Sequence, residues 1–144
     1  MKVLIHASLD FKEEMINARD YIQSHSKHSV VLPELTRYQD IRDKLGDDVT
    51  FTKIKNRLTL ENFANVETCD VLLIINPSHR DIDNYVGGNA FMEMVIAYYL
   101  KKPIFLTNEI PEGMSYTEEM KTFYPIVVGD YDTFLSKLDE LDVD

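Results

Sequence analysis

Apolar stretches of strand length alternate along the chain with longer segments in which apolar residues recur at helical spacing. The strand candidates are residues 2–7, 29–32, 71–75, 104–107 and 126–128. The helical segments are residues 10–24, 36–45, 51–68, 90–100 and 130–141. Such alternation is typical of parallel strands joined by crossover helices. It predicts an α/β fold, most simply a flavodoxin-like, doubly wound, five-stranded parallel sheet of order 2-1-3-4-5 with helices on both faces.

Short polar patterns predict where several helices begin. Asp10 followed by Glu13 is an acidic variant of the capping box, and Ser115 followed by Glu118 is a second capping box. Asp130 is the expected cap of the last helix, and Asn89 that of the helix at residues 90–100.

The central strand indicates where a ligand would bind. Residues 71–75 are five apolar residues without alternation, as expected for a strand that is buried on both faces. In a sheet of this order the ligand crevice lies outside the carboxyl ends of the first and third strands. Those ends are residues 6–10 and 76–89, so we expect a site there that includes His6, Ser8, Asn76, Gly87, Gly88 and Asn89.

One carboxylate interrupts an apolar helix. Residues 90–100 carry a single charge, Glu93, and a helix that is apolar nearly all round is buried in a core or an oligomer interface. We therefore expect at least a homodimer. Glu93 shares a helix face with Ala90, Ile96, Ala97 and Leu100. It either interacts with the helix dipole, a contribution of about 0.3 to 1 kcal/mol, or serves as a functional carboxylate, which we favour because sites concentrate buried carboxylates.

The remaining polar candidates each have a structural alternative. Gly87 and Gly88 either let backbone amides approach a ligand or only form a loop and cap. His6 is either a proton donor or a hydrogen-bonded core residue. The loop residues His79, Arg80, Asp81 and Asp83 form either a lid or a solvated loop, and His25 and His28 are expected at the surface. No pair of histidines has the spacing of metal ligands, so we expect neither a metal ion nor a cofactor.

Composition and charge limit the classes of molecule that the protein is expected to bind. The 144 residues, 44% hydrophobic and 28% charged, fit one globular domain over residues 1–144. The net charge of −10 disfavours nucleic-acid polymers and anionic membranes but allows a small anionic metabolite at a helix N-terminus. The single cysteine, Cys69, excludes an intramolecular disulfide and a cysteine-based zinc site, and with no signal peptide or membrane span in the sequence we expect a cytoplasmic protein.

Several of these residues together resemble a known family. They are Ser8 after the first strand, Cys69-Asp70 before the central strand, the glycine-containing loop, Glu93-Met94-Val95-Ile96-Ala97 and Lys102-Pro103. With them the chain resembles the nucleoside 2-deoxyribosyltransferase superfamily, which includes the 2′-deoxynucleoside 5′-phosphate N-hydrolases. The resemblance covers most of the chain and is most specific between Asp70 and Pro103.

The resemblance implies a homo-oligomeric enzyme that cleaves or transfers at the N-glycosidic bond of a nucleoside or nucleotide. Glu93 matches the family's nucleophile, which attacks the anomeric carbon to form a glycosyl-enzyme that a second base or water resolves. A carboxylate suits this chemistry because it stabilises and traps an oxocarbenium-like centre. Ser8, Gly87, Gly88 and Asn89 would then line the sugar or 5′-group pocket.

The chain departs from the family pattern at Leu4, Ala7, Asn62 and Val95, where the family has tyrosine, glycine, aspartate and glycine. Asn62, which the resemblance places among the substrate-binding residues, takes the position of the residue thought to protonate the leaving base, and an amide is no acid at neutral pH. These departures support a second hypothesis, a binding or sensing protein that kept the nucleotide pocket and lost catalysis. A flavin-binding flavodoxin fits the topology but lacks the phosphate loop rich in serine and threonine.

Overall fold

The computed structural model describes residues 1–35 and 38–142. In chain order the elements are β1 (Lys2–His6), the 3₁₀ turn η1 (Leu9–Phe11), α1 (Lys12–His25), β2 (Ser29–Val31), α2 (Tyr38–Leu45), α3 (Asp48–Thr68), β3 (Val71–Ile74), α4 (Gly88–Tyr99), β4 (Ile104–Leu106), α5 (Thr117–Thr122), β5 (Ile126–Val127) and α6 (Tyr131–Asp142). The predicted helix start at Thr36 and the tail residues Val143 and Asp144 lie outside the described residues.

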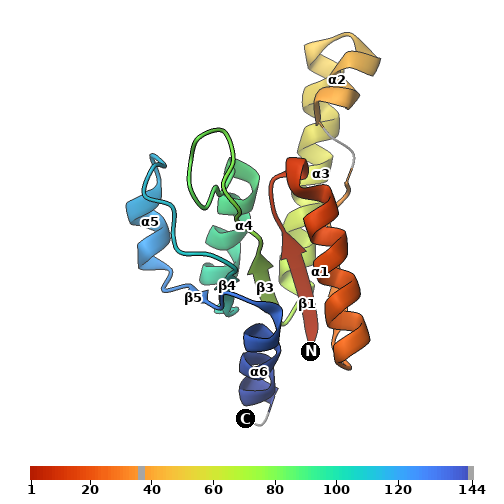
Figure 1. Ribbon diagram of the computed structural model, residues 1–144. Helices are drawn as coiled ribbons and strands as arrows, with labels where there is room; N and C mark the ends of the chain where they lie inside the picture. Colours follow the sequence, from red (N-terminus) through yellow and green to blue (C-terminus); the bar gives the residue numbers. More distant parts are fainter. Residues whose placement is uncertain (36–37, 143–144) are drawn as a thin grey trace.

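The strands form one parallel five-stranded sheet of order β2-β1-β3-β4-β5, which confirms the predicted fold class. β1 and β3 lie side by side at its centre (Figure 1), with Ile5 paired to Leu73 and Leu73 to Phe105 across the neighbouring strands. The chain crosses between these two strands by way of β2 and α3, so the topological switch point lies between β1 and β3.

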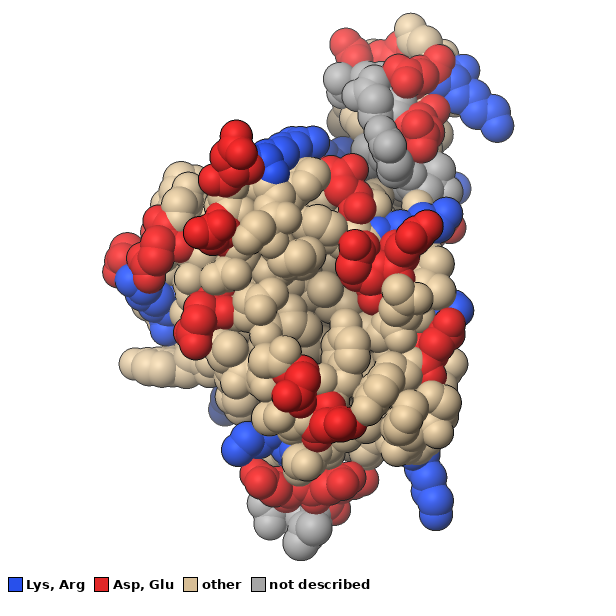
Figure 2. Space-filling view, viewed as in Figure 1, with Lys and Arg blue, Asp and Glu red and all other residues tan. Residues whose placement is uncertain are grey.

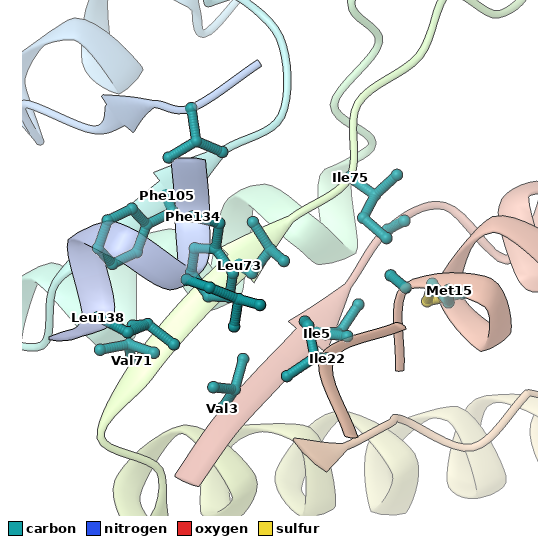
Figure 3. Packing of buried hydrophobic residues seen from close by; sticks show 14 of the residues in the cluster. Val3, Ile5, Met15, Ile22, Val71, Leu73, Ile75, Phe105, Phe134 and Leu138 are labelled. Carbon is teal, nitrogen blue, oxygen red and sulfur yellow. The ribbon is translucent and has the colours of Figure 1, made fainter. Parts of the chain in front are cut away.

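Alternate residues of the central strands supply two separate cores. Val3, Ile5, Val71, Leu73 and Phe105 face α1 and α6 and pack against Met15, Ile22, Phe134 and Leu138 (Figure 3). Leu4, Leu72, Ile74 and Leu106 face the other way and pack against residues of α3, α4 and α5, among them Val66, Met94, Ala97 and Met120. Both sheet faces are therefore covered, as the uninterrupted apolar run of β3 predicts. Among the described helices, none is long and apolar enough to cross a bilayer.

The helix α3 begins three residues earlier than the sequence pattern predicts. Asp47 caps it, because its Oδ1 accepts a hydrogen bond from the backbone N–H of Thr50 at 2.7 Å. α2 packs on the first turns of α3, and together they extend beyond the rest of the molecule (Figure 1). Figure 2 shows acidic side chains on this extension and around the periphery of the body.

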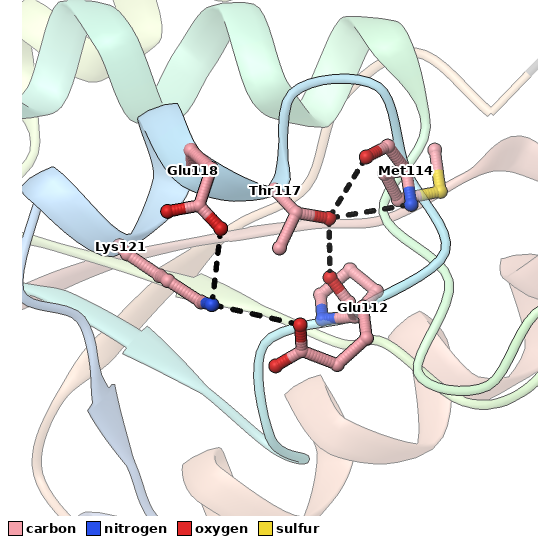
Figure 4. Close-up of polar contacts among 6 residues, drawn as sticks. Glu112, Met114, Thr117, Glu118 and Lys121 are labelled. Carbon is pink, nitrogen blue, oxygen red and sulfur yellow. Dashed lines mark hydrogen bonds and ion pairs between the residues drawn. The ribbon is translucent and has the colours of Figure 1, made fainter.

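Both predicted capping boxes are wrong, whereas the predicted cap Asp130 is confirmed. Ser8 rather than Asp10 caps the first turn, since its Oγ accepts from the N–H of Asp10 at 3.4 Å. The second box fails because Thr117 opens α5 and its hydroxyl donates to the carbonyl of Pro111 at 2.6 Å (Figure 4). Asp130 does cap α6, accepting from the N–H of Thr133 at 2.7 Å. Tertiary contacts thus decided which polar side chain reached each helix end.

Candidate active site

A pocket of about 250 Å³ opens at the carboxyl ends of β1 and β3, where the sheet order predicts a ligand site. One wall is the segment that follows β1, and the opposite wall is the loop before α4 together with the first turn of α4. Further residues come from the end of β2 and from α3. The lining residues are His6, Ala7, Ser8, Leu9, Asp10, Pro33, Glu34, Asn62, Arg80, Tyr85, Gly87, Gly88, Asn89 and Ala90.

Six of the seven residues predicted for substrate binding lie together in this pocket. They are His6, Ser8, Asn62, Gly87, Gly88 and Asn89. Asp10, Pro33, Glu34 and Tyr85 also line it but are not predicted by the sequence. A positional signal could have identified Pro33 and Glu34, because they directly follow the second strand and so reach the same edge of the sheet as Ser8.

Glu93 and His6 form a buried pair beside the pocket. Oε2 of Glu93 lies 2.8 Å from Nδ1 of His6, and the two side chains are only 1% and 3% exposed. His6 is part of the pocket wall, whereas Glu93 is not, so the imidazole lies between the carboxylate and the pocket. Neither Nδ1 nor either carboxylate oxygen has a well-directed hydrogen bond within the described part of the chain.

Burial raises the pKa of Glu93, and the neighbouring His6 partly offsets this effect. Removing the carboxylate from water disfavours its charged form, while an imidazolium at 2.8 Å favours it. Nδ1 of His6 faces Glu93, and His6 lines the pocket, so its other ring nitrogen, Nε2, is the one left for a ligand.

The N-terminus of α4 forms the opposite wall. Gly87 rather than Asn89 is the cap residue, and no side chain occupies the cap position. Glu93 consequently lies in the second turn, which weakens the alternative that it serves only the helix dipole. A Cβ on Gly88 would meet no atom within 4 Å, so this glycine leaves open space at the pocket. Backbone amides at an uncapped helix start are suited to bind an oxygen-rich ligand group.

The loop between β3 and α4 is fastened across the pocket to the end of β1. Nε2 of His79 lies 2.9 Å from Oδ2 of Asp10, and the guanidinium of Arg80 lies 3.6 Å from the same oxygen. The ring of His79 also meets the rings of Phe11 and Tyr85 edge-on, at centroid distances of 5.2 and 5.3 Å. Arg80 lines the pocket, so this loop bounds the site, and its role as a lid stays a prediction.

Asn76, the seventh predicted binding residue, does not line the pocket. It is fully buried, and its Oδ1 accepts hydrogen bonds from the hydroxyl of Thr107 at 3.1 Å and the N–H of Asn108 at 2.9 Å. Its Nδ2 donates to the carbonyls of Asn108 and Glu109, each at 3.1 Å. Asn76 thus ties the loop after β3 to the loop after β4, and we leave it out of the candidate site.

The structure also places His28, His25 and Cys69. The expectation that His28 lies at the surface is wrong, since it is buried and its Nδ1 lies 2.9 Å from the amino group of Met1. His25 is exposed, as expected. Cys69 is a buried free cysteine whose thiol pKa is raised by burial. Within the described residues, no three or more His, Cys, Asp or Glu side chains gather as metal ligands would.

The outer face of α4 carries large exposed apolar side chains. Tyr99 is 82% exposed, Tyr98 49% and Val95 39%, and Phe123 lies beside Tyr98 with the ring centroids 5.2 Å apart. α4 is therefore buried on the side of Glu93 and exposed on the other. The homodimer that the sequence predicts through this helix stays a prediction.

No protein-family model matches the sequence, and no curated protein matches it either. Among solved structures, the CMP N-glycosidase BcmB of Clostridium botulinum is similar over 96% of this chain and 99% of its own, with 14% sequence identity and a TM-score of 0.49. A likeness of this strength carries no argument about function.

Proposed function

We propose that the protein cleaves, or transfers at, the N-glycosidic bond of a nucleoside or nucleotide bound in the His6 pocket, with Glu93 as the nucleophile. The observation that carries this proposal is the buried carboxylate, 1% exposed, that contacts an imidazole of the pocket wall at the switch point of the sheet. The resemblance of the sequence to the nucleoside 2-deoxyribosyltransferase superfamily supports the same assignment.

The chemistry needs an ionised carboxylate close to the anomeric carbon. Burial raises the pKa of Glu93 and so favours its neutral form, whereas a positively charged His6 favours the carboxylate. An anion in a dry site stabilises an oxocarbenium-like centre more strongly than it would in water. Because Glu93 does not line the pocket, the carboxylate has to shift toward the pocket before it reaches C1′.

The proposal is tested by incubating the protein with a panel of ribo- and deoxyribonucleosides and their 5′-monophosphates and measuring the free base by chromatography. We expect release from at least one compound, and loss of release in Glu93→Gln. Glu119→Gln, an exposed helical carboxylate, is the matched control and should retain activity. Acid quenching followed by intact mass spectrometry should show one added sugar on the wild type and none on Glu93→Gln. A panel that stays intact at high protein concentration, with acceptor bases present, would refute the proposal.

The second candidate is a nucleotide-binding or sensing protein without catalysis. The enclosure of Glu93 behind His6 favours it, because a carboxylate outside the pocket wall contacts no ligand there. It predicts a rise in melting temperature with one of the same compounds and no product after long incubation. Base release that depends on Glu93 would exclude this candidate.

A further inference from the structure

Cleavage of an N-glycosidic bond needs a proton for the departing base as well as a nucleophile for the sugar. Among the described residues that line the pocket, the titratable side chains are those of His6, Asp10, Glu34, Arg80 and Tyr85. Asn62 also lines it, but its amide supplies no proton at neutral pH. The position of each titratable group decides which of them could act beside Glu93.

Four of these groups are poorly placed to donate a proton next to Glu93. Oδ2 of Asp10 already faces His79 and Arg80. Glu34 is exposed at the far side of the pocket, after β2. Arg80 does not release its proton under protein conditions, and the Tyr85 ring packs on Gly87 and His79.

His6 is the lining residue in direct contact with Glu93. Its Nδ1 lies 2.8 Å from Oε2 of Glu93, and the residue lines the pocket, which leaves Nε2 as the ring nitrogen available to a ligand. A nucleophile and an acid that act on adjacent atoms of one bond lie about 5 to 5.5 Å apart in retaining glycosidases. The width of the imidazole ring added to the 2.8 Å between Nδ1 and Oε2 puts Nε2 at a comparable distance from the carboxylate.

From this arrangement, and resting on the function proposed above, we infer that His6 is the general acid that protonates the leaving base. An oxygen of Glu93 bonds to C1′ while the C1′–N bond breaks, and its electron pair passes to the base nitrogen, which takes the proton of Nε2. In the second half, water bonds to C1′ and the ester bond breaks, returning its electron pair to Glu93. Neutral His6 then accepts the proton of that water. The sum is nucleoside plus water giving sugar plus base, and an acceptor base replaces water in a transfer.

The inference is tested with two substrates that share one sugar and one 5′-group, the best compound of the panel and its 4-nitrophenyl glycoside. A nitrophenolate leaves as an anion and needs no proton, whereas a nucleobase needs one. In His6→Asn, the Asn amide lies near the former position of Nδ1, so a polar group still faces Glu93 while Nε2 is lost. We expect kcat on the nucleoside to fall about 10²- to 10⁴-fold, the usual range for general acid catalysis. On the nitrophenyl glycoside we expect less than a tenfold loss.

Controls separate this role from folding and from the nucleophile. Glu93→Gln should lose both activities, because both substrates need the nucleophile. His25→Asn, an exposed histidine of α1, should lose neither. Melting temperatures identify a His6→Asn protein that fails to fold, and in that event His6→Gln is measured with the same expected split.

Three outcomes would overturn the inference. If His6→Asn loses the same fraction of kcat on both substrates, His6 only positions Glu93. If the rates on both substrates are unchanged, His6 has no part in the reaction. A wild type that releases neither base nor nitrophenolate would instead overturn the proposed function, and the acid role with it. The failure of the acid role and the failure of the proposed function therefore give different results.

Discussion

Replacing Asn76 with alanine separates its structural role from the ligand-binding role that the sequence suggests. In the structure the side chain joins the loops after β3 and β4, and the pocket does not include it. The substitution leaves the N–H of Asn108 without its acceptor at 2.9 Å and removes the acceptor of the Thr107 hydroxyl. We therefore expect lower stability with little direct effect on ligand contacts.

The magnitude follows from the lost hydrogen bonds. A buried donor left without an acceptor costs about 1 to 3 kcal/mol, and an ordinary hydrogen bond contributes about 0.5 to 1.5 kcal/mol. Asn76→Ala orphans one donor and removes four further side-chain hydrogen bonds, which at the low end of both ranges costs about 3 kcal/mol. For a domain of this size 1 kcal/mol shifts Tm by about 3 to 4 °C, so Asn76→Ala should lower Tm by at least roughly 9 °C.

The assay is urea unfolding followed by circular dichroism, together with thermal melts in the presence and absence of the best nucleoside or nucleotide. Asn56→Ala, an exposed position on α3, is the matched control and should change stability by less than about 0.5 kcal/mol. Asn76→Ala should keep nearly the wild-type ligand affinity at a temperature where it is fully folded. An unchanged Tm combined with lost binding would refute this reasoning and show that Asn76 contacts the ligand.

Three further substitutions probe the pocket itself. Burial raises the pKa of Glu93, so the neutral carboxyl stabilises the fold at pH values below the ordinary glutamate pKa, and this contribution is lost as pH rises through the folded-state pKa. Glu93→Gln should therefore melt above the wild type at pH 8 and level with it near pH 4.5, as measured by calorimetry. A Cβ at Gly88 meets no atom within 4 Å, so Gly88→Phe should fold and, with its ring filling space at the pocket, abolish the ligand-induced rise in Tm. Asp10→Asn should weaken the fastening of the loop and speed hydrogen exchange at the amides of His79 and Ile82, which a mass-spectrometric exchange experiment can follow.

The sheet order was predictable because apolar burial dominates it. β3 has no polar residue, and β1 alternates between the two cores, so both had to be central strands. The helix ends were less predictable, because a cap depends on which polar group reaches an N–H first. The Thr117 hydroxyl bonds to Pro111, a contact set by the fold of the preceding loop that no capping pattern encodes.

The members of the site were predictable, but the order in which they face a ligand was not. The switch-point rule brings His6, Ser8 and the Gly87-Gly88 pair to one edge, since it depends on strand order alone. Whether the side chain of His6 or of Glu93 forms the pocket wall depends on rotamers and on the distance between β1 and α4. No periodicity in the sequence encodes that distance.

The pair of His6 and Glu93 is hard to explain by stability. α4 is otherwise apolar where it meets the sheet, and an apolar residue at position 93 would avoid burying a carboxylate without a well-directed hydrogen bond. His6 offsets part of that energetic penalty, yet the pKa of Glu93 remains raised, so the penalty outweighs the compensation. A group that destabilises the fold and lies one imidazole ring from a pocket is what a reaction requires, namely an anion kept dry until a substrate arrives. Glu93→Gln should therefore raise stability and remove activity in the same protein, whereas a residue present only for packing would lower stability when it is changed.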